Sequence, residues 1–225
     1  MVKLVIFDVD GTLVDSQATI LGAMTAAFAS LDMPAPDRAA ILSIVGLSLD
    51  QAIFRLVPER PLEERDALVA GYRHAYSTHR AQTGAAAGSP LYPGALEVIE
   101  TLAARDDVSL GIATGKSRRG LTALLDDHGL AKHFVTTQVA DDHPSKPHPS
   151  MILTALAESG CEAGNAVMIG DTSYDMEMAR NAGVTGIGVG WGYHAPAELS
   201  KATPHVLDDF AGLTGVLEQI WKVTA

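Results

Sequence analysis

Two aspartates, Asp8 and Asp10, directly follow the apolar segment Lys3 to Phe7. The segment is short and rich in branched side chains, so it predicts a buried strand that ends where the carboxylates begin. Residues two apart on an extended chain share a face, and neighbouring carboxylates are unfavourable unless a cation, a lysine or a shared proton compensates them. Thr12 is expected to brace the Asp10 side chain. The pair is a candidate chemical site, and the alternative is an ordinary solvated junction between strand and loop.

Two further predicted strands also end in polar residues. The segment Val108 to Ala113 is followed by Thr114, and the segment Ala166 to Ile169 is followed, after one glycine, by Asp171. Ligands bind at the carboxyl ends of the strands in an open parallel sheet. If the three strands are neighbours, Thr114 and Asp171 therefore converge with Asp8 on one edge of the sheet.

Four motifs follow one another along the chain: DVDGT at Asp8 to Thr12, Thr114, Lys146 between prolines in SKPHP, and GDTSYD at Gly170 to Asp175. In this order and spacing they resemble the haloacid dehalogenase (HAD) superfamily of phosphotransferases, and the resemblance covers essentially the whole chain. It implies an α/β fold, with a Rossmann-like parallel sheet core, helices on both faces and an inserted helical cap domain.

The resemblance also implies roles for the four aspartates. Asp8 would be the nucleophile that attacks phosphorus and forms an aspartyl-phosphate, and Asp10 would protonate the leaving alcohol and later take a proton from water. Asp8, the main-chain carbonyl of Asp10 and Asp171 would hold Mg²⁺, an ion that prefers oxygen ligands. Asp175 would hold a metal-bound water or orient Lys146. The alternative for Asp175 is a first-turn acid that faces the helix dipole.

The remaining motif residues are expected to bind phosphate. Thr114 would hydrogen-bond the transferring phosphoryl oxygens, assisted by the main-chain amides of Gly115 and Lys116. Lys146 would neutralise the charge that builds up on the nucleophile and the phosphate. The alternatives are a threonine at a buried strand end and a lysine on the surface.

Composition limits the partners. The chain has 225 residues, is 47% hydrophobic and has a formal net charge of −11, which is typical of a soluble globular protein of one large or two modest domains. The negative charge, with no local cluster of lysine and arginine, disfavours nucleic acid and membrane surfaces. We expect a small phosphorylated metabolite as partner and a monomer or small homo-oligomer. The single cysteine, Cys161, agrees with a reducing compartment, so we expect a cytoplasmic location.

Between the first and second motifs the pattern changes from strand to helix. From residue 16 to about 80, apolar residues recur at intervals of three and four, and prolines and a glycine divide this block into about four helices. The small, proline-containing stretch Ala81 to Gly94 is predicted to be a flexible hinge. The block is therefore predicted to be an inserted helical cap with hinge linkers, residues 16–85, on a core of residues 1–15 and 86–225.

After the hinge, helix and strand alternate, which predicts a parallel sheet. The expected helices are 95–104, 118–128, 150–159 and 174–182, and the expected strands after the first are 108–113, 134–137, 166–169, 186–189 and 205–207.

Several members of the resembled superfamily differ in chemistry. Dehalogenases need no second aspartate, so Asp10 favours a phosphatase. Phosphonate-cleaving relatives use a cap lysine, and no lysine lies between Lys3 and Lys116. Sugar phosphomutases use a histidine and a lysine of the cap, and the expected first cap helix, 17–31, has neither, so a mutase stays an alternative. The closest resemblance is to phosphoglycolate phosphatase-like enzymes, including pyrophosphatase relatives.

The substrate is less constrained by the sequence. The loop Ser43 to Leu49, which turns at Gly46, is small and uncharged and is expected to contribute shape. Arginines that could bind an acidic substrate, although each is expected to face solvent, are Arg38, Arg55, Arg73, Arg118 and Arg119. A different class also stays open, in which the core is a catalytically idle module that binds metal or phosphate.

Overall fold

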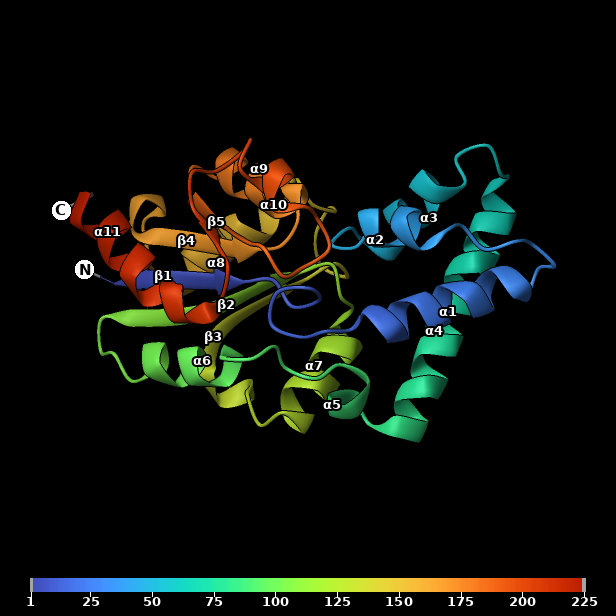
Figure 1. Ribbon diagram of the computed structural model, residues 1–225, viewed down its shortest axis with the longest axis horizontal. Coiled ribbons are helices and arrows are strands. Elements are labelled where there is room, and N and C mark those ends of the chain that lie inside the picture. Colours follow the sequence, from blue (N-terminus) through green and yellow to red (C-terminus); the bar gives the residue numbers. More distant parts are fainter. Residues whose placement is uncertain (1, 224–225) are drawn as a thin grey trace.

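The computed structural model describes residues 2–223, in which six parallel strands form one sheet (Figure 1). The strand order is β3-β2-β1-β4-β5-β6. The strands are β1 (Lys3–Phe7), β2 (Val108–Thr114), β3 (Phe134–Val139), β4 (Ala166–Gly170), β5 (Thr185–Val189) and β6 (Val206–Leu207). The predicted parallel sheet is confirmed, and its first, second and fourth strands are neighbours.

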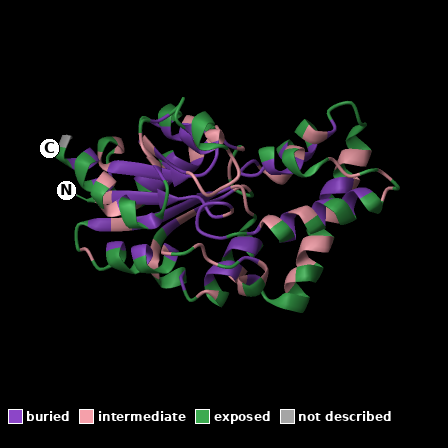
Figure 2. Ribbon diagram, viewed as in Figure 1, coloured by how far each residue is buried: buried purple, intermediate pink, exposed green. Residues whose placement is uncertain are grey.

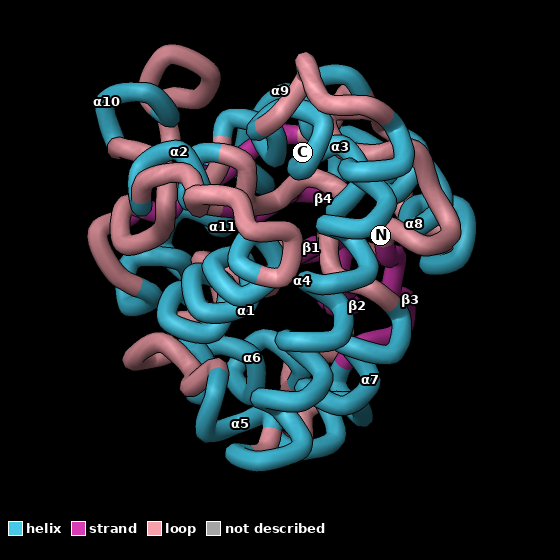
Figure 3. The backbone as a smooth tube through the Cα atoms, turned by 90° about the vertical axis from the view of Figure 1, so that its right-hand side faces the viewer, coloured by secondary structure: helices cyan, strands magenta, loops and turns pink. Residues whose placement is uncertain are grey.

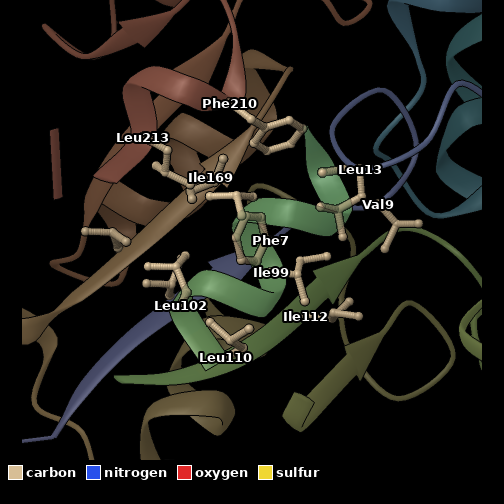
Figure 4. Packing of buried hydrophobic residues seen from close by; sticks show 14 of the residues in the cluster. Phe7, Val9, Leu13, Ile99, Leu102, Leu110, Ile112, Ile169, Phe210 and Leu213 are labelled. Carbon is tan, nitrogen blue, oxygen red and sulfur yellow. The ribbon is translucent and has the colours of Figure 1, made fainter. Parts of the chain in front are cut away.

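The central strand β1 is buried on both faces of the sheet. Helices α6 (Ala95–Ala103), α7 (Arg118–Asp127) and α11 (Leu213–Val223) contribute to the hydrophobic cluster on one face, and α8 (Ser150–Ser159) and α9 (Ser173–Asn181) to the cluster on the other. Figure 4 shows Phe7 of β1 among Ile99, Ile112 and Ile169. Burial from both sides explains why β1 is apolar from Leu4 to Phe7 instead of alternating between apolar and polar residues. Figure 2 shows that its neighbouring strands are also mostly buried.

The helices expected from sequence on either side of the sheet are present with bounds that agree within one residue. Helix α11, by contrast, was not predicted. Its sequence, LTGVLEQIWKV, contains threonine, glycine and valine, which are weak helix formers. Burial of Leu213 and Leu217 against the core favours the helix instead. Two short α-helices, α5 (Ala85–Gly88) and α10 (Pro196–Leu199), also belong to the part of the chain that contains the sheet.

Four helices follow β1 and form a separate layer, as predicted. They are α1 (Gln17–Ala29), α2 (Arg38–Ser43), α3 (Leu49–Leu56) and α4 (Leu62–Thr83). Ile20, Met24 and Phe28 lie one helical turn apart on α1 and are buried in a hydrophobic cluster formed mainly by these four helices. Figure 3, viewed from this side, shows α1 and α4 in front of the sheet.

The stretch that was predicted to be a flexible hinge has a different local structure from the one expected. Its first residues, Ala81 to Thr83, belong to the last turn of α4, and Ala85–Gly88 forms α5. Alanine is the strongest helix former, which explains why this small-residue stretch is largely helical. Beyond it, Leu91 pairs with Val14 in an isolated bridge and ties the returning chain to the turn that follows β1. Among the described residues, no helix combines the length and the apolar character needed to cross a membrane.

Candidate active site

The predicted convergence of polar side chains at one edge of the sheet is confirmed. Asp8 follows β1, Thr114 ends β2 and Asp171 follows β4, and β1 is hydrogen-bonded to both of the other strands. The main-chain amide of Asp8 donates to the carbonyl of Ile169 at 2.9 Å, which extends the pairing to the first carboxylate. The three side chains are almost completely buried. The register of the sheet therefore brings the three side chains to the same edge.

Asp8 lies beside a buried lysine. The Nζ of Lys146 is 3.0 Å from Oδ1 of Asp8 and 2.6 Å from Oδ1 of Asp175. Although the ammonium is within ion-pair distance, neither oxygen of Asp8 accepts a hydrogen bond of acceptable geometry from the described residues. Burial raises the pKa of Asp8 from 3.8 to about 7, even though the charge of Lys146 opposes this change. Asp8 thus has two oxygens that can take a further partner.

Asp171 is held by the loop that follows β1. The hydroxyl of Thr12 donates to Oδ1 of Asp171 at 3.0 Å, and the main-chain amide of Tyr193 donates to Oδ2 at 2.8 Å. Thr12 therefore does not brace Asp10 as predicted, because the turn points its hydroxyl across to β4. The turn depends on Gly11, whose φ is +85° and at which a Cβ would overlap the carboxylate of Asp171. Burial raises the pKa of Asp171 well above its usual range, and the neighbouring carboxylates add to the effect.

Asp175 links the helix start to the lysine. Its Oδ2 accepts hydrogen bonds from the main-chain amide of Thr172 at 3.1 Å and from the Thr172 hydroxyl at 2.7 Å, and Thr172 in turn caps α9. Its Oδ1 accepts from Lys146. Asp175 is therefore an acid in the first turn of α9 and also contacts Lys146. The two interpretations are compatible, although the sequence analysis gave them as alternatives.

The three carboxylates form a candidate metal site. Asp8, Asp171 and Asp175 each offer an oxygen atom, and these atoms lie within 4.8 Å of one another. Three buried carboxylates close together repel one another, and a divalent cation would relieve this repulsion. The donor set is oxygen only, and neither oxygen of Asp8 accepts a hydrogen bond from another described residue, so the residues fit a hard cation such as Mg²⁺.

Asp10 lies apart from this group, with its own cation. The Nζ of Lys116 donates to both carboxylate oxygens of Asp10 at 2.8 Å, and the Ser16 hydroxyl donates to Oδ1 at 2.6 Å. Lys116 also donates to the hydroxyl of Tyr76 on α4, at 3.0 Å. Burial opposes the charge on Lys116, yet the attraction of Asp10 raises its pKa above the ordinary value. Only the main-chain amide of Lys116 was considered from sequence, and its side-chain contact was missed.

The loop after β2 touches the helical layer. Thr114 accepts a hydrogen bond from the main-chain amide of Lys116 at 3.2 Å, which fixes the turn. A Cβ on Gly115 would lie 2.6 Å from the carbonyl oxygens of both Gly46 and Leu47. Only glycine therefore allows the loop between α2 and α3 to come this close.

Further contacts hold the helical layer over the sheet edge. The main-chain amide of Ser48 donates to the Ser145 hydroxyl at 2.8 Å, and the Tyr174 hydroxyl donates to the carbonyl of Ser43 at 2.9 Å. Between the two layers lies a cavity of about 560 Å³ that Asp8, Asp10 and Thr114 line on the sheet side. Most of the predicted specificity loop, from residue 44 to 49, lines it on the other side.

The candidate arginines divide into two groups. Arg73 and Arg119 line the cavity, as does Arg80, which sequence reasoning missed. The others are engaged elsewhere: Arg38 with Gln17, Arg55 with Tyr174, and Arg118 with Asp142 and Thr137. Arg80 lies near the end of α4, in the segment predicted to be the last part of the helical cap. No signal in the sequence indicated that this residue would line the site.

Comparisons with known proteins agree with this geometry. Residues 5–189 match the family described as haloacid dehalogenase-like hydrolase. A probable phosphatase, IndB, of Dickeya dadantii is 37% identical over 100% of this chain and 97% of its own. A phosphoglycolate phosphatase of Rhodospirillum rubrum is 33% identical over 95% of this chain and 90% of its own. The crystal structure of a hydrolase from Pseudomonas syringae superposes with a TM-score of 0.83 at 28% identity, covering 97% of this chain and 99% of that one. The chain therefore belongs to the haloacid dehalogenase-like hydrolases, as an enzyme of their phosphatase type.

Proposed function

We propose that the chain is a Mg²⁺-dependent phosphomonoester hydrolase of a small phosphorylated metabolite, which acts through an aspartyl-phosphate on Asp8. The observation that carries the proposal is the position of Asp8. Within residues 2–223 its two oxygens accept no hydrogen bond, the Nζ of Lys146 lies 3.0 Å from Oδ1, and the carboxylate borders the cavity. Relatives named phosphoglycolate phosphatase place phosphoglycolate and related esters among the first substrates to test.

The chemistry follows from the residues around the cavity. An oxygen of Asp8 attacks phosphorus in line, and the leaving alcohol takes a proton from Asp10. Water then hydrolyses the acyl-phosphate, with Asp10 accepting its proton, so that Asp8 returns to the carboxylate and Asp10 to the carboxylic acid with which the cycle began. Thr114 and the amides of Gly115 and Lys116 would bind the phosphoryl oxygens, while Lys146 stabilises their negative charge.

The metal would be held by Asp8 and Asp171, with the main-chain carbonyl of Asp10 as a further ligand and Asp175 behind them. When bound, Mg²⁺ supplies positive charge that allows an anionic phosphate to approach an anionic nucleophile. Thr12 and the amide of Tyr193 orient Asp171 toward this position. Asp175 keeps the ammonium of Lys146 directed at Asp8.

The proposal includes the division into a core, residues 1–15 and 86–225, and a cap, residues 16–85. The separate hydrophobic cluster formed mainly by α1–α4 supports it. Opening of the cap would admit substrate, and closure would exclude bulk water from the reacting carboxylates.

The test is phosphate release from a panel of small phosphoesters, with phosphoglycolate, sugar phosphates, nucleotides and pyrophosphate, in the presence and absence of Mg²⁺. Wild type is compared with Asp8→Asn and with Asp106→Asn, an exposed aspartate that serves as matched control. We expect Mg²⁺-dependent turnover that Asp8→Asn abolishes and Asp106→Asn retains.

Turnover that survives Asp8→Asn would move the nucleophile elsewhere and contradict the proposal. Absence of turnover across the panel, together with a rise in Tm on adding inorganic phosphate, would contradict it as well and favour an idle phosphate-binding module.

A further inference from the structure

We infer that the preferred substrate carries an uncharged leaving group of about ring size with an apolar face, and not a short carboxylate such as glycolate. This inference rests on the proposed function and narrows its substrate class. It derives from the size of the cavity, from the order of apolar and charged residues along it, and from the contacts of its cations.

The cavity is large for a two-carbon ester. Its volume is about 560 Å³ although the layers are already in contact through Gly115, Ser48 and Tyr174. Pockets of roughly 300–1,000 Å³ are typical for ligands of drug size. A bound substrate with its phosphoryl group next to Asp8 and a leaving group of two carbons would leave much of this space to water.

An apolar belt surrounds the space next to the catalytic residues. We define the belt as the buried or half-buried lining residues Ile20, Met24, Val45, Leu47, Ala52 and Tyr72. Leu47 belongs to the loop that touches Gly115, one residue from Thr114, so the belt begins where the phosphoryl site ends. The ring of Tyr72 lies 5.8 Å from that of Tyr76, and together the two present aromatic surface to a bound ring.

Several of the charged lining residues are exposed, and we take them to mark the opening of the cavity to solvent. Asp50, Arg73 and Arg119 line it and are exposed. Arg73 lies 4.0 Å from Asp50, in a solvent-exposed pair. A polar substituent at the far end of a ring-sized group could reach this opening, whereas a carboxylate two atoms from the ester oxygen would stay within the belt.

The cation that a short carboxylate would need is engaged. Lys116 is bound by both oxygens of Asp10 and by the hydroxyl of Tyr76. Arg80, the other half-buried cation of the lining, donates a single hydrogen bond, from one Nη to the carbonyl of Arg119 at 3.4 Å. A glycolate carboxylate in the belt would therefore lose its hydration beside a lysine that is already paired with Asp10, which is unfavourable.

The experiment compares four alkyl phosphates in the presence of Mg²⁺: ethyl phosphate, phosphoglycolate, benzyl phosphate and carboxybenzyl phosphate with the carboxylate at the ring position next to the ester arm. Their leaving alcohols are all aliphatic, so kcat/KM reports mainly the fit of the leaving group. We expect kcat/KM for benzyl phosphate to exceed that for ethyl phosphate by at least about tenfold, and each added carboxylate to lower it by a similar factor.

Two variants examine the belt directly. Ala52→Leu fills part of it, and Tyr72→Leu removes its ring, so each should lower the ratio of kcat/KM for benzyl over ethyl phosphate by about fivefold or more. Ala70→Leu, the same substitution at an exposed position of α4, is the control and should keep the wild-type ratio. The wild-type panel decides the matter even if a belt variant fails to fold.

The inference is overturned if phosphoglycolate is used better than ethyl phosphate, or if ethyl and benzyl phosphate are equivalent. Either result, obtained with turnover that depends on Asp8, leaves the proposed hydrolase intact. Loss of Asp8 dependence would instead remove the proposed function itself, so the two failures are distinguishable.

Discussion

The carboxylate of Asp8 is in an environment that favours its protonated form. Burial raises its pKa from 3.8 to about 7, while in the unfolded chain it would ionise near the ordinary value. Burial raises the pKa of Asp171 in the same direction. Between these values the folded protein binds more protons than the unfolded chain, so its stability decreases as the pH rises. At neutral pH, binding of a divalent cation would compensate the charge of these buried carboxylates and is therefore favoured.

We therefore expect the protein without metal to lose stability as the pH rises from about 4 to about 7, with the Asp8 contribution on the order of 2–4 kcal/mol. Urea unfolding in the presence of EDTA, measured across this range, would show a steeper loss for wild type than for Asp8→Asn, because asparagine does not ionise. The control Asp106→Asn should follow wild type. Equal slopes for wild type and Asp8→Asn would show that Asp8 ionises normally.

Thr12 affects the metal site through Asp171. Thr12→Val keeps the shape of the side chain and removes the hydroxyl that donates to Oδ1 of Asp171 at 3.0 Å. Loss of such an outer contact typically weakens metal binding about 10–100-fold. We expect the Mg²⁺ concentration for half-maximal activity to rise by this factor, with little change in kcat at saturating Mg²⁺. Thr101→Val, at an exposed position of α6, is the matched control, and equal Mg²⁺ dependence of the two variants would contradict the assignment.

At the scale of elements, the start of α9 combines a helix cap with the site. Thr172 and Asp175 form a reciprocal capping box, and the same Asp175 holds Lys146. The helix terminus therefore determines where the ammonium lies relative to Asp8. A defect in the N-cap of α9 should therefore reduce both the stability of the protein and its activity.

Thr172→Ala tests this coupling. Loss of this helix N-cap should lower the free energy of unfolding by about 1–2 kcal/mol. It should also reduce kcat, since Asp175 loses the hydroxyl that donates to its Oδ2 at 2.7 Å. Urea unfolding and steady-state kinetics give the two values. Thr25→Ala, on the exposed side of α1, provides the reference. A Thr172→Ala protein with the stability of wild type but reduced activity would show that the N-cap of α9 and the site are not coupled in this way.

The elements and the sheet edge could be predicted because they depend on local pattern. Buried runs such as Lys3–Phe7 mark parallel strands, and the polar residue after each run marks the site edge. The contacts of Thr12 with Asp171 and of Lys116 with Asp10 could not be predicted in the same way. They join residues 159 and 106 positions apart, and they depend on turn geometry that propensity does not specify. Helix α11 was missed because its burial outweighs its weak propensity.

At the scale of the whole molecule, the layer formed by α1–α4 contacts the rest of the chain at several points around the cavity. One of them is the approach of Gly115 to the main chain of Gly46 and Leu47, and another is the ion-pair group in which Lys116 joins Asp10 to Tyr76 of α4. The residues that would bind phosphate are thus the same ones that touch the cap. If the helical layer moves as the proposed cap, its closure and the completion of the site are coupled, because both depend on this short loop.

Gly115→Ala should keep the cap from closing fully. The added Cβ would lie 2.6 Å from two carbonyl oxygens of the cap loop, and the core side is fixed by the strand β2 and by the hydrogen bond to Thr114. We expect kcat/KM for a small phosphoester to fall by about tenfold or more, while the Tm changes little, because the strain is relieved by opening and not by unfolding. Gly164→Ala is the control, since a Cβ there would meet no atom within 4 Å. Unchanged kcat/KM in Gly115→Ala would mean that the reaction proceeds without this close approach, and that the cap can act from a more open position.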